Sequence, residues 1–192
     1  MRLTALFQKF WHFLWHEDSL FSWIVNLILA FVLVKWVIYP LIGLLFSTSY
    51  PIVAVVSGSM EHNGLSFDQW WERNSWYQEH EITQEAFASY SFSNGFNKGD
   101  IMILHGAAPK SIKRGDVLVY ENPFYRNPII HRVVEIRESD GSLTFITKGD
   151  NNPVPDQQPV TPAQITRTGK AILRIPYLGW INIGFANLFG GI

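Results

Sequence analysis

Residues 129–147 read IIHRVVEIRESDGSLTFIT and carry the clearest fold signal in the chain. Their two halves, 129–136 and 143–147, are rich in β-branched and aromatic residues, and the intervening Asp140-Gly141 pair favours a tight hairpin turn. Similar short runs lie upstream, at residues 52–56, 101–104 and 117–120. The sequence therefore predicts a mainly β domain of antiparallel strands.

Three turns between these runs repeat one pattern, a basic residue followed by Gly and Asp. They are Lys98-Gly99-Asp100, Arg114-Gly115-Asp116 and Lys148-Gly149-Asp150. In such turns Gly can take a positive φ, and Asp can hydrogen-bond to its own backbone. We expect the three turns to be structural.

The N-terminal part is much more apolar than the rest. Residues 19–46 contain one charge, Lys35, and a helix of this length would extend about 42 Å, enough to cross a bilayer with tilt. Residues 1–18 mix aromatic with basic residues, as helices lying in a membrane interface do. We expect an interfacial segment followed by one transmembrane anchor. A cleaved signal peptide is the competing interpretation, but the run is long for one.

Composition excludes several classes of function. The chain of 192 residues has a formal net charge of −1 and scattered Lys and Arg, which disfavours nucleic-acid binding. It has no Cys, so disulfides, a thiolate nucleophile and Cys-based zinc sites are excluded. His62 and His80 lack metal-ligand spacing, so we expect neither a metal nor another cofactor.

Two further segments belong to the expected β domain at residues 47–192. Residues 62–97 form an aromatic insert, with Ser66 and Gln69 at capping-box spacing and Thr83 as a second helix cap. This insert could pack on the sheet, cover a cleft or dip into a bilayer surface. The tail at 175–192 is apolar but broken by Pro and Gly, so we expect it to rest on the membrane surface.

The residues that could carry chemistry are a serine turn, a strand histidine and two acids. Ser57-Gly58-Ser59-Met60 follows an apolar run, and His131 lies in the 129–136 strand. A serine hydroxyl needs a neighbouring base to remove its proton and a third group to orient that base. Asp150 and Asp156 follow downstream and are candidates for the third role.

These motifs, in this order, resemble those of type I signal peptidases. The matching residues are Ser57-Gly58-Ser59-Met60-Glu61, His131-Arg132-Val133 and Lys148-Gly149-Asp150-Asn151-Asn152, within about residues 50–178. The similarity is to the archaeal and endoplasmic-reticulum branch, which has histidine where the bacterial branch uses lysine. One departure is His62, which stands where that branch usually has Pro.

The resemblance implies a signal-peptidase-like antiparallel β domain behind one transmembrane helix. It implies a membrane-bound serine endopeptidase that removes signal peptides from exported preproteins after small residues at −1 and −3. It assigns Ser59 as nucleophile, His131 as general base and acid, and Asp156 as orienting acid. Ser57 would help stabilise the oxyanion, and Asp150 would brace the site through backbone hydrogen bonds.

The resemblance also implies a location and partners. The N-terminus would be cytoplasmic, and the domain would lie on the extracytoplasmic or lumenal side of the cell membrane or the endoplasmic-reticulum membrane. The partners would be preproteins, membrane lipid and possible contacts with the translocation machinery. Only 12 residues separate Phe46 from Ser59, which would keep the site near the bilayer.

Strand alternation suggests the walls of the substrate pockets. It would put Val53, Val55 and Ser57 on one face, so we expect the pockets for small residues to be formed by Val53, Val55, Met60 and Ile130. Two alternatives stay open. One is an inactive membrane-anchored binding module of the same fold, and the other is a self-processing regulator with a Ser-Lys pair, for which no lysine stands at the base position.

Overall fold

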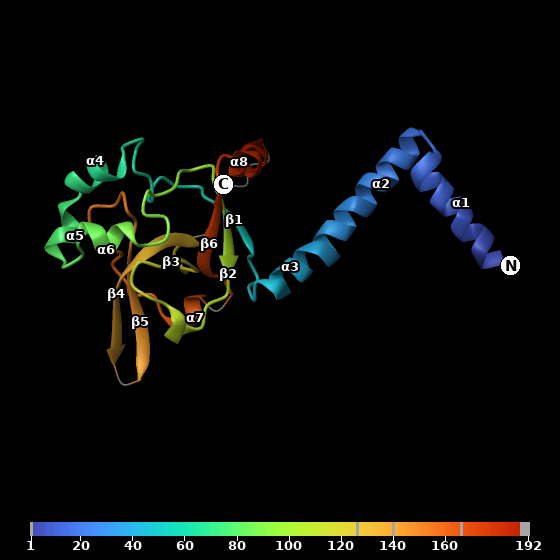
Figure 1. Cartoon of the computed structure of the whole chain (residues 1–192). Coiled ribbons are helices and arrows are strands. Elements are labelled where there is room, and N and C mark those ends of the chain that lie inside the picture. Colours follow the sequence, from blue (N-terminus) through green and yellow to red (C-terminus); the bar gives the residue numbers. More distant parts are fainter. Residues whose placement is uncertain (1, 126, 140, 166, 189–192) are drawn as a thin grey trace. The chain divides into compact units, whose positions relative to one another are not determined.

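The computed structural model describes residues 2–125, 127–139, 141–165 and 167–188 (Figure 1). The chain forms two compact units, Met1–Leu45 and Phe46–Ile192. Residues 189–192 of the expected membrane-surface tail, and Asp140 of the expected hairpin turn, lie outside the described residues.

The N-terminal unit consists of helices. Helix α1 spans Arg2–His16, and a long helix follows as α2 (Leu20–Leu33), the π-helical turn η1 (Val34–Ile38) and α3 (Tyr39–Leu45). Ser19 caps α2 by accepting a hydrogen bond from the Ser22 N–H at 3.1 Å. The Ser22 hydroxyl donates to the Phe13 carbonyl at 2.8 Å, and Asn26 Nδ2 donates to the Leu14 carbonyl at 2.9 Å. These polar side chains join the end of α1 to α2 by satisfying carbonyls that a helix end leaves free.

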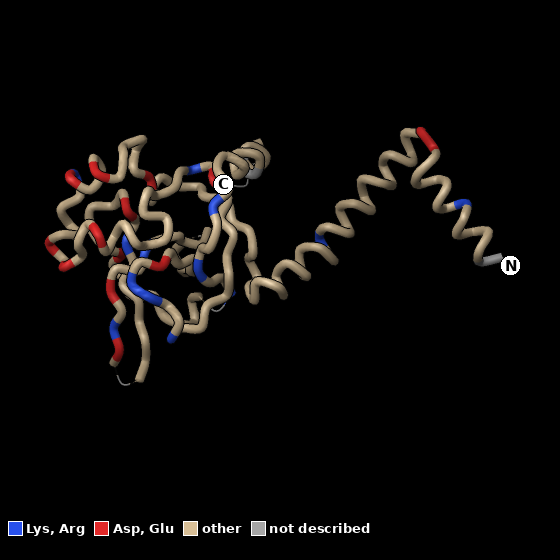
Figure 2. The backbone as a smooth tube through the Cα atoms, in the orientation of Figure 1, with Lys and Arg blue, Asp and Glu red and all other residues tan. Residues whose placement is uncertain are grey.

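The helix Leu20–Leu45 is long and apolar enough to cross a membrane, and it is the one such helix among the described residues. A signal sequence near an N-terminus would meet the same criteria of length and composition. Charged side chains are sparse along it (Figure 2). The π turn precedes Pro40, which has no N–H and whose ring crowds the carbonyl four residues earlier. The Tyr39 N–H bonds the Val34 carbonyl instead, which is the wider π pattern.

The second unit is built on one antiparallel sheet of six strands in the order β1-β2-β6-β3-β4-β5 (Figure 1). This confirms the predicted mainly β fold with an N-terminal apolar helix and small helices. The six strands are β1 Ile52–Ala54, β2 Ile101–His105, β3 Val117–Tyr120, β4 Ile129–Ser139, β5 Ser142–Lys148 and β6 Gly169–Ile175. The sequence analysis did not predict β6, which joins the β1-β2 pair to the β3-β4-β5 meander.

Side chains on the sheet form two apolar clusters. The first includes Val55, Met60, Met102 and Val119. The second includes Leu118, Val133 and Phe145, and lies under the segment that carries helix α7 (Pro162–Ile165). A 3-10 turn, η2 (Pro109–Ser111), precedes β3, and helix α8 (Gly179–Leu188) follows β6. Residues of the two clusters alternate along β3, because successive side chains of a strand point to opposite faces.

The insert at 62–97 folds as three short helices, α4 (Phe67–Glu72), α5 (Ser75–Glu79) and α6 (Gln84–Ala88). The Ser66–Gln69 capping box is present, and Thr83 caps α6. The aromatic side chains of the insert form a third buried cluster that includes Val134 of the sheet. Its buried members are Trp70, Trp71, Tyr77, Ile82, Phe87 and Val134. The insert therefore packs against the sheet, which was one of its three possible roles.

The three Gly-Asp turns differ in one respect from expectation. Gly99 and Gly115 have positive φ angles of 90° and 93°, as predicted. Gly149 does not, so its backbone conformation is open to any residue. It is instead required for close approach: an added Cβ would lie 2.7 Å from the Ser59 carbonyl oxygen and 2.8 Å from Asn152 Nδ2.

Candidate active site

The best-defined interaction of the site joins His131 to Asp156. His131 lies on β4 opposite Leu118 of β3, and its Nδ1 is 2.7 Å from Asp156 Oδ2. An ionised carboxylate can only accept hydrogen bonds, so Nδ1 carries the proton and donates it. In the neutral imidazole the other ring nitrogen, Nε2, then carries no proton and can act as a base.

Asp156 is held by several donors. Its Oδ2 also accepts hydrogen bonds from the Tyr120 hydroxyl at 2.8 Å and from the Thr147 hydroxyl at 2.6 Å. Burial alone would raise the pKa of Asp156, but the hydrogen bond and charge of His131, with the Thr147 and Tyr120 hydroxyls, outweigh it. The pKa of Asp156 therefore lies below its ordinary value, and the group is ionised at neutral pH.

The two serines lie next to each other where the chain leaves β1. Ser57 Oγ is 3.2 Å from Ser59 Oγ, and either hydroxyl can be the donor. Within the described part of the chain no hydrogen bond joins Ser59 to His131 directly. Catalytic hydrogen bonds are often long in a free enzyme and shorten when substrate binds.

One cleft of about 930 Å³ contains all four of these residues. Ser57, Ser59, His131 and Asp156 line it together with the apolar side chains of Ala54, Val56 and Ile130. The loops on either side contribute Asn122, Phe124, Tyr125, Asn127 and Pro128, and residues 152–158. Residues from widely separated parts of the sequence thus share one solvent-filled groove. The structure brings together the predicted nucleophile, base and orienting acid.

The expected pocket walls need a correction. Ile130 lines the cleft, but Val55 and Met60 are buried in the first apolar cluster, and Val53 packs against it. Strand alternation begins one residue out of phase with the prediction, so Ala54 and Val56 face the cleft. β1 pairs only through Ala54, and the bend at Ser57-Gly58 then breaks the alternation, which returns Ser57 to the cleft side.

Asp150 lies outside the cleft lining, within a buried network. Its carboxylate accepts hydrogen bonds from Arg132 Nε at 2.9 Å and Nη2 at 2.7 Å, and from the Tyr77 hydroxyl at 2.9 Å. Burial alone would raise the pKa of Asp150, but the charge and hydrogen bonds of Arg132, with the His62 ring 3.5 Å away, hold this pKa well below its usual range. The sequence analysis expected backbone bonds here, whereas side chains make these contacts.

Arg132 holds the insert to the sheet. Besides Asp150, its guanidinium donates to the carbonyl oxygens of Ser91 and Phe92 in the insert, at 2.7 and 2.9 Å, and to that of Gly115 at 3.0 Å. Arg132 is fully buried, and each of its five N–H groups has an acceptor in this network. Because neighbouring residues of a strand face opposite ways, Arg132 serves this network while His131 faces the cleft.

Asn151 is a positioning residue that the sequence analysis missed. Its backbone N–H donates to the Ser59 carbonyl at 2.8 Å, and its Nδ2 donates to the Gly58 carbonyl at 3.0 Å. Asn63 Nδ2 donates in turn to Asn151 Oδ1 at 3.0 Å. The turn that contains Asp150 therefore fixes the serine loop through the backbone. Asn151 belongs to the motif at residues 148–152, but no local sequence pattern indicates this contact.

Lys148 is buried away from the cleft. Its Nζ donates to the Gly149 carbonyl at 3.1 Å and lies 4.6 Å from the centre of the Tyr77 ring. Burial lowers the pKa of Lys148 to about 8. The side chain contacts the aromatic insert, so it does not share the groove with Ser59.

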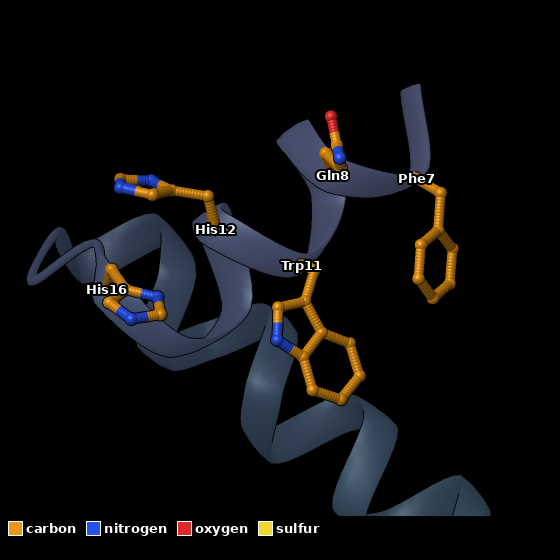
Figure 3. Close-up of a pocket in the computed structure, with 5 residues that line it drawn as sticks. All are labelled: Phe7, Gln8, Trp11, His12 and His16. Carbon is orange, nitrogen blue, oxygen red and sulfur yellow. The ribbon is translucent and has the colours of Figure 1, made fainter. Parts of the chain in front are cut away.

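A second hollow, of about 390 Å³, lies on α1 of the N-terminal unit (Figure 3). It is lined by Phe7, Gln8, Trp11, His12 and His16. Phe7 and Trp11 are largely exposed, and the hollow contains no acid and no serine. Elsewhere too, the described residues contain no group of three or more His, Asp or Glu side chains placed to hold a metal ion.

Known proteins with related sequences point to one family. The chain is 32% identical over 101 residues to the signal peptidase complex catalytic subunit SEC11C of Homo sapiens and of Canis lupus familiaris, covering 50% of this chain and 53% of each relative. The chain thus spans about half the length of these relatives. It is 28% identical over 162 residues to SEC11 of Scheffersomyces stipitis, covering 81% of this chain and 78% of the relative. No family model matches the chain.

The order of the motifs and these relatives both indicate similarity to the type I signal peptidases. More narrowly, its relatives carry the name of the catalytic subunit of the signal peptidase complex, including SEC11 of Schizophyllum commune at 27% identity over 163 residues. These relatives agree with the resemblance that the motifs indicated.

Proposed function

We propose that this protein is a membrane-bound serine endopeptidase that removes signal peptides from exported preproteins after small residues at −1 and −3. Ser59 is the nucleophile, His131 the general base and then acid, and Asp156 the acid that orients His131. The observation that carries this proposal is the sharing of one cleft by Ser59 and the His131–Asp156 pair.

The reaction follows from these positions. His131 Nε2 takes the proton of Ser59 as its oxygen attacks the scissile carbonyl, and Asp156 stabilises the imidazolium that forms. His131 then gives the proton to the leaving amine, which releases the mature protein. A water molecule, deprotonated by the same imidazole, hydrolyses the remaining acyl-enzyme and frees Ser59.

Ser57 has the position of an oxyanion donor. Its hydroxyl lies 3.2 Å from Ser59 Oγ and lines the same cleft. Together with the Ser59 N–H it would donate to the oxygen that becomes negative, a contribution of about 2.7 to 4 kcal/mol per donor. The Ser57 hydroxyl therefore contributes mainly in the transition state.

Specificity for small residues rests on the apolar wall nearest the serines. Ala54, Val56 and Ile130 line the cleft there. A wall of this kind accepts Ala, Ser or Gly and rejects larger side chains by clash. An extended substrate would bind beside these residues by main-chain hydrogen bonds, which requires the signal peptide to leave its helix near the cleavage site.

The helix Leu20–Leu45 supports a single-pass membrane anchor. We place the N-terminus in the cytoplasm and the β domain on the extracytoplasmic or lumenal side of the cell membrane or endoplasmic-reticulum membrane. Preproteins, lipid and the translocation machinery are the partners. Because its relatives are named as subunits of the signal peptidase complex, assembly into such a complex belongs to the same proposal. Engineered glycosylation sites in the β domain test its orientation.

Cleavage of a purified preprotein by the full-length protein in detergent tests the activity. The wild-type protein should release the signal peptide, and Ser59→Ala should not, while retaining the wild-type melting temperature. Ser75→Ala, an exposed serine of the insert, is the matched control and should cleave normally. The absence of cleavage by the wild-type protein, with lipid and with several preproteins, would favour the inactive binding module instead.

A further inference from the structure

Three hydrogen-bond donors converge on a single oxygen of Asp156. His131 Nδ1, the Tyr120 hydroxyl and the Thr147 hydroxyl lie 2.7, 2.8 and 2.6 Å from Oδ2. The Tyr120 and Thr147 oxygens are themselves 3.2 Å apart. Tyr120 and Thr147 are both buried, so solvent does not replace these bonds.

Donors that compete for one carboxylate oxygen weaken its hold on each of the others. Each hydroxyl withdraws part of the negative charge that would otherwise stabilise a protonated His131. An imidazolium facing a carboxylate with no other donor is more stable, and its pKa is higher. The two hydroxyls therefore weaken the stabilisation that Asp156 gives to a protonated His131.

We propose that Tyr120 and Thr147 are positioning residues that set the pH range in which His131 acts as a base, by sharing the carboxylate oxygen of Asp156. The expected effect on cleavage rests on the proposed function. The basicity of His131 does not, because it can be measured in the folded protein without any activity.

Other charged or titratable groups near this network are few. From β3 the group facing the pair is Tyr120, whose pKa is raised by burial, so it stays protonated. Tyr125 of the following loop interacts with Tyr120, and Lys148 of β5 interacts with Asp156 through charge. Tyr125 and Lys148 are unchanged in the variants below, so a shift in His131 basicity reports the lost hydroxyl of Tyr120 or Thr147.

The test measures the pKa of His131 directly by NMR. Full-length protein with labelled histidine is titrated in detergent micelles, and the His131 signal is assigned by its loss in His131→Gln. Tyr120→Phe and Thr147→Val should each raise the His131 pKa by about 0.5 unit or more, which lowers the free-base fraction at acid pH about threefold. Thr147→Ser keeps a hydroxyl and should restore the wild-type value.

Thr168→Val is the matched control. The Thr168 hydroxyl is also buried and donates to the Val119 carbonyl, with no bond to Asp156. It should lower the melting temperature and leave the His131 pKa unchanged. If the control shifts the pKa as much as Tyr120→Phe and Thr147→Val do, or if neither variant shifts it, the proposal is overturned.

The acid limb of the pH profile of kcat/KM provides the second readout. In Tyr120→Phe and Thr147→Val it should move to higher pH by the same amount as the His131 pKa, with activity recovering above pH 8. A purely structural role predicts equal loss at every pH. If no variant and no wild-type sample cleaves a preprotein, the proposed function fails, and the NMR titration still decides the role of Tyr120 and Thr147.

Discussion

Gly149 lies directly against the backbone of Ser59, so that a Cβ at position 149 would stand 2.7 Å from the Ser59 carbonyl oxygen. That distance is too short for two non-bonded heavy atoms. The hydrogen bond from the Asn151 N–H to the same Ser59 carbonyl keeps the turn and the serine loop from moving apart. The turn and the serine loop are therefore fitted to each other backbone to backbone.

Gly149→Ala should consequently move the serine loop while leaving the fold in place. A displacement of about 1 Å at a reacting group can cost about 100-fold in rate, and we expect a loss of kcat on that scale. Gly184→Ala is the control, because nothing lies within 4 Å of an added Cβ there. Cleavage rates and melting temperatures of both variants provide the comparison, and unchanged kcat in Gly149→Ala would show that the loop is not held this tightly.

Ser59 and His131 should behave as one unit. Ser59→Ala, His131→Ala and the double variant should all fall to a similar residual rate, because removing either residue disables the same proton transfer. Single-turnover cleavage of a preprotein measures this residual rate. Losses that add in the double variant would show that the two residues act independently.

Replacing His131 with lysine should not restore activity. A lysine base must lose its proton at neutral pH, and position 131 lies beside an ionised acid, which favours the charged ammonium. Asp156 would stabilise the ammonium and keep it protonated. Cleavage by His131→Lys at neutral pH is the measurement, and robust activity would contradict the assignment of the base.

Asp156→Asn and Asp150→Asn should have opposite effects. Asp156→Asn should reduce kcat about a thousandfold or more with little change in KM, since it removes the partner that fixes the histidine tautomer. Asp150→Asn should destabilise the fold by about 3 to 5 kcal/mol, because it leaves the buried Arg132 charge without its counter-ion. Kinetics and thermal melts that gave the reverse pattern would exchange the two roles.

The Asp150 effect on stability should not depend on pH between 5 and 8. Its pKa is lowered in the folded state, so its stabilisation is complete above the unfolded value of about 3.9 and declines only at more acid pH. Denaturant titrations of the wild type and Asp150→Asn across this range should therefore give a constant difference.

Lys148 should instead make stability rise with alkaline pH. Its pKa falls from 10.5 to about 8 on folding, so between these values the unfolded chain binds more protons and folding becomes more favourable as pH rises. This shift corresponds to about 3 kcal/mol, which is a cost of burying the charged amine at neutral pH. Lys148→Met should recover part of it at pH 7 and flatten the stability curve between pH 8 and 10, as chemical denaturation can show.

The sequence was sufficient for the pattern of strands but not for the phase of one of them. Five of the six strands follow from β-branched runs and turn residues, while β6, with Gly169, Lys170 and Arg174, has a weaker signal. Strand alternation extended through Ser57 predicts Val53 and Val55 on the cleft side, whereas both belong to the apolar core there. The backbone bend at Ser57-Gly58, which breaks that alternation, depends on tertiary contacts that no local pattern reports.

In the candidate site, too, the sequence identifies some residues and not others. The motifs identified Ser59, His131 and both acids, because their chemistry requires those residue types. Tyr120 and Asn151 bond groups that lie 36 and 93 residues away along the chain, and Thr147 bonds Asp156 nine residues away, across a turn. These are common residue types, and nothing in their local sequence marks such contacts. Gly149 is similar, since its turn pattern suggested a positive φ where the real requirement is space.

His131 and Arg132 are neighbours in one strand, but their side chains serve different parts of the molecule. The cleft uses the first, and the hydrogen-bonded network that fastens the insert to the sheet uses the second. In a descendant that no longer cleaved peptides, position 131 would be free to drift while position 132 would stay arginine for as long as the domain folded. Among relatives of this chain, loss of the histidine at position 131 would therefore mark proteins without peptidase activity. An arginine at position 132 would show only that the fold is kept.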